Sequence, residues 1–225
     1  MRFFEYSYTA SQATFLDYLK TIGVVLDTVI LDINELPGDV YAVSKDAAKA
    51  GMQILSERFN AEMQTRNPVI NEVFDIQVDP NEELLGKKMD FDDFIGEGYD
   101  FQSSKINLFR YDPDTLVIYH IAKKGFAKAL LNPPYNLKFK RPDEFASPIY
   151  IDGENRFYAE IIKRYLAEIL HVEQLSDADF LEIISWSDNW TNYFDDGKEW
   201  WGTFCWTIHD MRNNTITLIA ASSTD

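Results

Sequence analysis

The sequence predicts an α+β fold, with a mainly antiparallel sheet packed by three or four amphipathic helices. Two hairpin patterns indicate the sheet, one at about 104–122 and the other at 201–221, because each places a turn between two strand-like runs. Apolar residues at helical spacing indicate the helices. Residues 1–225 are expected to form a single globular domain, because no convincing linker interrupts the chain; its weakest join is the proline-rich stretch 132–148.

The expected helices follow helical spacing, capping residues and helix breakers. Four segments are expected to be helical: about 11–22, 44–66, 124–131 and 155–170. The last has the widest apolar stripe, and Glu160 and Arg164 are spaced for an i,i+4 ion pair on it. Gly23 and Pro68 are placed to end the first two. The sequence leaves a further short helix near 81–95 open.

The expected strands are short and rich in β-branched or alternating residues. Besides the hairpins they are 2–8, 24–33 and 69–78. The second hairpin turns at 210–214 and is apolar on both faces, which predicts a sheet buried on both sides. At 176–186 the pattern leaves two alternatives, a short helix capped near Ser176 or a strand over 180–186.

The charge of the chain is strongly negative and unevenly distributed. The 37 acidic and 21 basic residues give a net charge of −16, which disfavours nucleic-acid binding by the surface as a whole. Residues 67–101 hold ten acids and two lysines, and residues 171–225 hold ten acids and two basic residues, so each segment sums to −8. Residues 102–141 sum to +6, from eight basic and two acidic residues. The pattern indicates either internal charge pairing or an acidic surface for a basic partner.

No segment of the sequence has the pattern of a membrane span or a secretory signal. No run approaches the roughly 18 apolar residues that a spanning helix needs, and Glu5 and Asp17 interrupt the first residues. The single cysteine, Cys205, has no partner for an internal disulfide. The sequence therefore predicts a soluble cytoplasmic protein with no membrane association.

The search for catalytic and metal-binding motifs leads to no assignment. His120, His171 and His209 lie far apart and show no metal-ligand spacing, and neither a P-loop nor a Gly-x-Ser-x-Gly elbow is present. Cys205 lies between Phe204 and Trp206 in an apolar strand, so we expect an unreactive core thiol. No catalytic residue, metal or cofactor is therefore predicted.

One short motif, Asn132-Pro133-Pro134-Tyr135, resembles the catalytic motif of amino-methyltransferases. The resemblance implies a ring that stacks on the target base and a Gly-rich turn after a strand for S-adenosylmethionine. The only candidate for that turn is 95–98, and the 33 residues between the two sites read as a hairpin and a short helix. A doubly wound fold needs a further unit of about 30 residues there. The alternative is that the two prolines simply end the helix at 131.

The most unusual stretch is 186–206, because it contains all five tryptophans of the chain. Rings alternate there with carboxylates and amides, a mixture used in sugar-binding sites and in protein-interaction hot spots, although large rings are more often buried in a core. Trp190, Tyr193 and the loop 195–198 are expected to be the exposed members. The candidate binding residues are Asp188, Trp190, Tyr193, Asp195, Asp196, Glu199 and Trp200.

Two classes of function follow from this stretch. The pattern favours a non-catalytic binding or interaction protein, which presents an acidic, tryptophan-rich C-terminal surface to a basic protein partner. The alternative is a carbohydrate-binding or hydrolase-type protein for a small polar ligand, with the carboxylates of 188–199 as paired acids and Trp190 or Trp200 as the stacking ring.

Overall fold

The computed structural model describes the chain as two compact units. The described residues are 3–34, 38–66, 75–96, 98–106, 109–112, 117–120, 124–134, 148–198 and 201–222. Unit 1 comprises Met1–Ser7, Leu26–Met89 and Leu181–Asp225, and unit 2 comprises Tyr8–Val25 and Asp90–Phe180. The predicted α+β class is confirmed. That 1–225 form one domain stays a prediction, and most of its weakest join, 132–148, lies outside the described residues.

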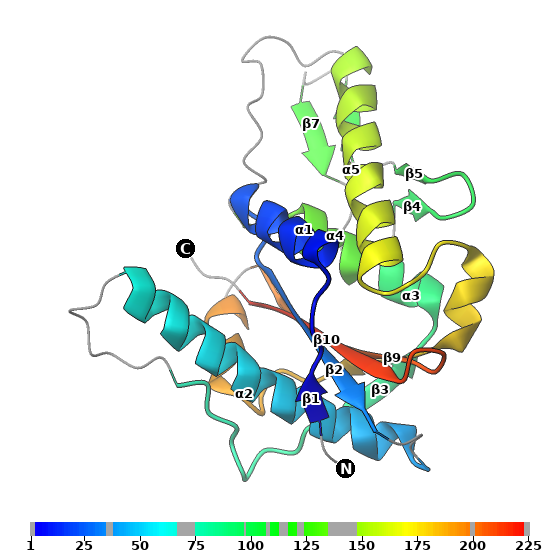
Figure 1. The fold of residues 1–225 in the computed structure, drawn as a ribbon. Coiled ribbons are helices and arrows are strands. Elements are labelled where there is room, and N and C mark those ends of the chain that lie inside the picture. Colours follow the sequence, from blue (N-terminus) through cyan, green and yellow to red (C-terminus); the bar gives the residue numbers. More distant parts are fainter. Residues whose placement is uncertain are drawn as a thin grey trace. The chain divides into compact units, whose positions relative to one another are not determined.

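Unit 1 contains a six-stranded sheet in which every neighbouring pair is antiparallel (Figure 1). The strands are, in spatial order, β1 (Phe3–Glu5), β2 (Leu26–Ile33), β10 (Thr215–Ser222), β9 (Thr203–Asp210), β8 (Leu181–Trp186) and β3 (Gly86–Met89). The hairpin predicted at 201–221 is confirmed as β9 and β10, which pair Trp206 with Ile219. Adjacent residues of β10, whose side chains point to opposite faces, are all buried from Thr215 to Ala221, so both faces of this hairpin are buried as predicted.

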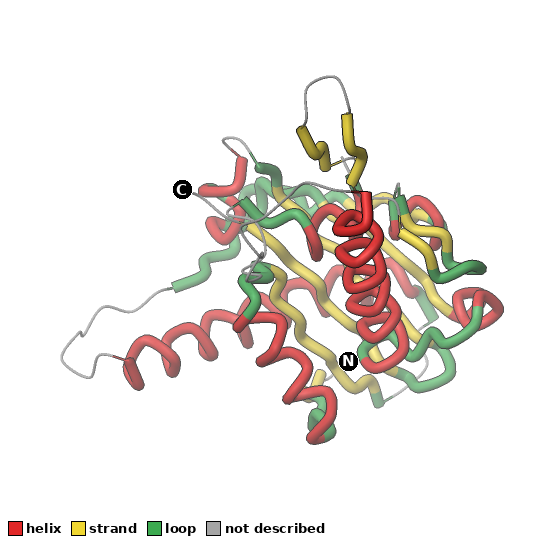
Figure 2. Tube along the Cα trace, turned by 90° about the horizontal axis from the view of Figure 1, so that it is seen from above, coloured by secondary structure: helices red, strands yellow, loops and turns green. Residues whose placement is uncertain are grey.

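The long helix α2 (Val40–Arg66) lies across one face of this sheet (Figure 2). It presents its smallest residue, Gly51, to β10, because a Cβ at that position would overlap the side chain of Leu218. Met52 and Leu55 pack with Leu31 and Trp186 in the same core. The Trp186 indole donates a 2.8 Å hydrogen bond to the Thr207 hydroxyl, so the ring is buried with its polar atom satisfied.

Unit 2 is mainly helical, with two small two-stranded sheets. Its elements are α1 (Ala10–Thr21), α3 (Phe91–Ile95), β4 (Tyr99–Asp100), β5 (Lys105–Ile106), β6 (Phe109–Asp112), β7 (Val117–His120), α4 (Gly125–Leu131), α5 (Pro148–Glu168) and the 3₁₀ helix η1 (Leu175–Phe180). The first predicted hairpin is present as β6 and β7, but the start of its first strand pairs with β4 instead, as β5. The first strand of this predicted hairpin is therefore two strands, β5 and β6, with different partners.

A chain of aromatic contacts runs through unit 2 from α1 to the β4–β5 hairpin. Seven rings follow one another with neighbouring centroids 4.8–6.4 Å apart: Phe15, Tyr165, Phe126, Phe94, Phe91, Phe101 and Tyr99. The contacts with edge-to-face or offset geometry are favourable for aromatic pairs. This chain connects the core of unit 2 to the rings of the hairpin.

Several local predictions differ from the structure. The segment 81–95, where the sequence indicates only a short helix, contains the strand β3 before the short helix α3. At 176–186 both alternatives occur in succession, since η1 ends at Phe180 and β8 begins at Leu181. Arg164 pairs with Glu168 at 2.5 Å and not with the predicted Glu160. Of the described helices, none has the length and apolar character that a membrane-spanning segment requires.

Candidate functional site

The tryptophan-rich stretch belongs largely to the core of unit 1. The four tryptophans that the structure describes, Trp186, Trp190, Trp201 and Trp206, are all buried. The prediction that Trp190 is exposed is wrong: its side chain is 0% exposed, and its indole donates a 2.7 Å hydrogen bond to the carbonyl oxygen of Ser187. The backbone of Trp190 is bonded to a residue outside the stretch, because its carbonyl oxygen accepts a 2.8 Å hydrogen bond from the backbone amide of Asp79.

Tyr193, also predicted to be exposed, is buried as well. Its hydroxyl donates a 2.7 Å hydrogen bond to the carboxylate of Asp27 on β2, and its ring stacks parallel to Phe59 of α2 at 6.5 Å. Burial raises the pKa of Tyr193 well above its usual value, and the neighbouring Asp27 charge raises it further. Tyr193 is therefore a neutral core residue that anchors the stretch to the sheet.

The carboxylates of the stretch have separate surroundings. Asp188 accepts a 2.5 Å hydrogen bond from the Thr203 hydroxyl, whereas the exposed Asp195 forms a 3.0 Å ion pair with Lys198. Asp196 is exposed, and Glu199 and Trp200 lie outside the described residues. Among the described residues no group of three or more His, Cys, Asp or Glu side chains could hold a metal ion.

Cys205 is the buried core thiol that the sequence predicts. Burial raises its pKa far above the usual range of a thiol, and the nearby charge of Asp188 adds to the effect. With Trp190 and Tyr193 in the core, the stretch offers a ligand exposed carboxylates at Asp195 and Asp196 and no exposed face of either ring. That these residues bind a ligand stays a prediction.

The methyltransferase-like motif ends a helix. α4 stops at Leu131, and Asn132 is its C-cap residue. Gly96, in the candidate cofactor turn, follows the helix α3 and not a strand. Tyr135 and Glu97 lie outside the described residues.

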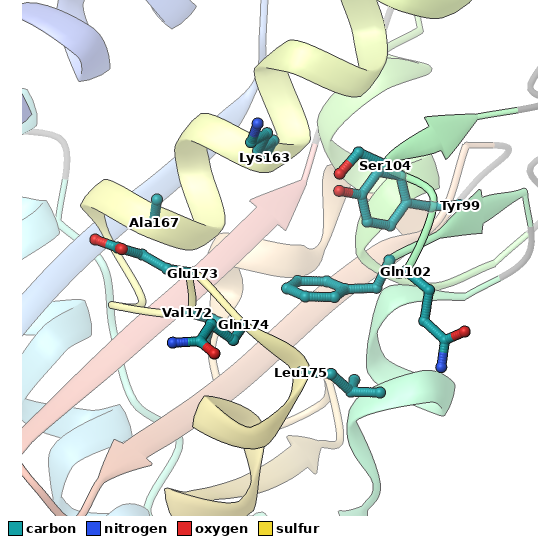
Figure 3. Close-up of a pocket in the computed structure, with 10 residues that line it drawn as sticks. Tyr99, Gln102, Ser104, Lys163, Ala167, Val172, Glu173, Gln174 and Leu175 are labelled. Atoms are coloured by element: carbon teal, nitrogen blue, oxygen red, sulfur yellow. The ribbon is translucent and has the colours of Figure 1, made fainter.

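Unit 2 contains a groove that was not predicted from the sequence (Figure 3). It consists of a larger cavity of about 610 Å³ and a smaller one of about 350 Å³. The two cavities adjoin, because they share four of their lining residues: Tyr99, Phe101, Gln102 and Leu175. We call the pair the hairpin groove. In the larger cavity Tyr99 and Ser104 lie on one wall, and Lys163 and Ala167 of α5 lie on the other (Figure 3).

The β4–β5 turn holds the rings of the hairpin groove in place. The Asp100 carboxylate accepts hydrogen bonds from the backbone amide of Gln102 at 3.0 Å and from the Ser103 hydroxyl at 2.7 Å. The hydrogen bonds that Ser103 donates lower the pKa of Asp100, so the carboxylate stays charged. Ser104 closes the turn with a φ of 49°, in the left-handed region. The backbone that carries Tyr99 and Phe101 is thereby part of a short, well-bonded turn.

Three rings form adjacent walls of the smaller cavity. The ring of Phe101 lies 5.8 Å from that of Phe91 with an interplanar angle of 76°, and 6.3 Å from that of Tyr99 at 83°. Phe91 is the first residue of α3, whose N-cap Asp90 accepts a 2.7 Å hydrogen bond from the Asp93 amide. The rings therefore come from two separately stabilised elements.

The charged residues among the described lining of the hairpin groove are mainly acidic. Asp92, Asp100 and Glu173 are its carboxylates, and Lys163 is the one basic residue among the described lining residues. Burial raises the pKa of Tyr99, opposed by a hydrogen bond with Ser104, and the charge of Glu160 raises it further. The groove thus combines rings, one neutral phenol and an excess of negative charge, which suits a ligand that is cationic and partly apolar.

The sequence contains a weak signal for this groove. Tyr99 and Phe101 flank Asp100 at the end of the acidic segment 67–101, but nothing local indicates that Leu175 lies beside them. Comparisons with protein-family models, with curated proteins and with solved structures found no match.

Proposed function

We propose that this chain is a non-catalytic binding protein that takes a basic, partly apolar segment of a partner protein into the hairpin groove. The observation that supports the proposal is the pair of adjoining cavities with aromatic walls and, among their described lining residues, three carboxylates against one lysine. A basic segment would meet complementary charge at the rim and apolar surface inside.

Two further features support a basic partner. The net charge of −16 would steer a cationic partner toward the protein and raise its association rate, more at low ionic strength than at high. Leu175, at the junction of the two cavities, is 41% exposed, so its apolar surface is available to a partner. The proposal keeps the class of partner that the sequence predicts and assigns it to unit 2.

The proposal can be tested with two labelled peptides of equal length. One alternates lysine with leucine and the other alternates glutamate with leucine, and fluorescence anisotropy measures the binding of each. We expect the lysine peptide to bind with an affinity that falls as salt is added, and the glutamate peptide not to bind. Equal binding of both peptides, or binding of neither, would refute the proposal.

Neighbouring aspartates provide a matched pair of variants for the same assay. Asp92 and Asp93 are both exposed in the first turn of α3, but only Asp92 lines the groove. We expect Asp92→Asn to weaken binding of the lysine peptide about two- to five-fold, as expected for loss of one exposed charge contact, and Asp93→Asn to change it less. An equal effect of both would indicate a general charge effect instead of a site.

A further inference from the structure

Aromatic rings contribute more of the described lining of the smaller cavity than carboxylates do. Phe91, Tyr99 and Phe101 all line it, and the planes of neighbouring rings lie at 76° and 83° to one another. The face of an aromatic ring attracts a cation within about 6 Å of its centroid, and two nearly perpendicular rings can do so together.

One of the two carboxylates of this cavity, that of Asp100, already accepts hydrogen bonds within its own turn. Asp100 accepts hydrogen bonds from the Ser103 hydroxyl at 2.7 Å and from the backbone amide of Gln102 at 3.0 Å. Its remaining contribution to a ligand is mainly its charge. Asp92, the other carboxylate of this cavity, is exposed and therefore lies in a well-solvated position. Both acids favour a cation in the cavity without requiring that the cation donate hydrogen bonds.

The rings are held before any ligand arrives. Phe91 contacts Phe94 at 6.3 Å, and Phe94, which is fully buried, stacks on Phe126 of α4 at 5.1 Å. A preformed wall reduces the entropy lost when a ligand is bound. Leu175, at the edge of the same cavity, offers apolar surface to the methylene stem of a long side chain.

From this arrangement we infer that the smaller cavity holds the ammonium group of a partner lysine side chain against the rings of Tyr99 and Phe101, which the buried Phe91 supports through its contact with Phe101, and that it accepts a methylated ammonium equally well. This inference rests on the proposed function, because it concerns one side chain of the basic segment. Methylation keeps the positive charge and removes N–H donors. Contact through rings survives that change, whereas contact through hydrogen bonds to carboxylates does not.

Three versions of the lysine–leucine peptide test the inference. The central residue is lysine, trimethyllysine or the neutral norleucine, and all other positions are unchanged. We expect trimethyllysine to bind at least as tightly as lysine, and norleucine to bind roughly two- to thirty-fold more weakly, the range that a cation–π contact provides.

The outcomes separate the inference from the proposed function. Tighter binding of lysine than of trimethyllysine would overturn the inference, because it would show that N–H donors are needed. Equal binding of lysine and norleucine would overturn it too. In both cases the proposed function stands if the lysine peptide still binds and the glutamate peptide does not. If none of these peptides binds, both proposals fail.

A ring variant adds a test at the site itself. Phe101→Leu keeps an apolar side chain and removes the ring face, so we expect it to abolish the preference for lysine and trimethyllysine over norleucine. Phe157→Leu removes a ring of α5 that does not line either cavity and serves as the control. Circular dichroism of both variants establishes that they fold; should Phe101→Leu not fold, the comparison of the three peptides on the unaltered protein decides the inference.

Discussion

Gly96 and Gly125 meet backbone to backbone in unit 2, where the end of α3 reaches the start of α4. A Cβ on Gly125 would lie 2.7 Å from the Gly96 Cα and 2.9 Å from the Phe94 carbonyl oxygen. Both glycines have positive φ values, 81° and 75°, which side chains other than glycine's rarely adopt. Next to this close approach Phe94 stacks on Phe126, and Phe94 also contacts Phe91, one of the rings that line the hairpin groove.

We therefore expect Gly125→Ala to destabilise the protein by about 2–4 kcal/mol, from the steric overlap and the left-handed backbone together. Urea unfolding followed by circular dichroism measures the change. Gly38→Ala is the control, because a Cβ on Gly38 would meet nothing within 4 Å, and we expect less than about 0.5 kcal/mol there. Equal effects of the two substitutions would contradict the close approach.

The hydrogen bond from Tyr193 to Asp27 leads to a second prediction. Tyr193→Phe keeps the ring that stacks on Phe59 and removes the hydroxyl that donates to the carboxylate. We expect a loss of about 1–3 kcal/mol in the free energy of unfolding. A double-mutant cycle with Asp27→Ala, which removes the acceptor, should show that the two losses are not additive. Additive losses would show that the hydroxyl and the carboxylate do not interact.

The burial of His209 leads to a prediction of how the stability of the protein depends on pH. His209 is 1% exposed in β9, and neither ring nitrogen has a hydrogen-bond partner. Burial lowers its pKa, and the charges of Asp210 and Glu182 oppose the shift only in part. The unfolded chain therefore binds a proton at a higher pH than the folded protein does. The protonation of His209 therefore does not reduce the free energy of unfolding above about pH 6.5, the pKa of histidine in the unfolded chain. Below that pH the free energy of unfolding decreases as the pH falls.

The corresponding experiment compares the unaltered protein with His209→Phe in urea unfolding between pH 5 and pH 7.5. This one group can contribute at most about 1.4 kcal/mol per pH unit. We expect the variant to lose less stability than the unaltered protein as the pH falls. Parallel pH profiles would show that His209 does not titrate differently in the two states.

The buried thiol of Cys205 provides a direct check of the core of unit 1. Because burial raises the pKa of Cys205 and shields it from solvent, we expect negligible reaction with a thiol reagent at pH 8 in the native protein. In guanidinium chloride the same thiol should react at the rate of a free cysteine. Rapid labelling of the native protein would place Cys205 at the surface.

Local patterns in the sequence were sufficient for the fold class and for several elements. The apolar, strand-like runs of β9 and β10 and the turn at 210–214 predict the hairpin, because strand pairing across a short turn depends on neighbouring residues. The apolar stripe of 155–170 likewise predicts most of α5, which begins earlier, at Pro148. The strand β3 was missed, because its four residues, with Lys87 and Lys88 at the centre, have no apolar alternation.

The sequence by itself determined the α+β class, the C-terminal hairpin and the uneven distribution of charge, since each depends on residues close together in the chain. Only the tertiary structure decided that Trp190 and Tyr193 are core residues, because their partners, Asp79, Phe59 and Asp27, are more than a hundred residues away. The same holds for the hairpin groove, where Leu175 joins the rings of Tyr99 and Phe101. Burial and concavity arise from contacts between distant segments, and local periodicity does not record which segments will meet.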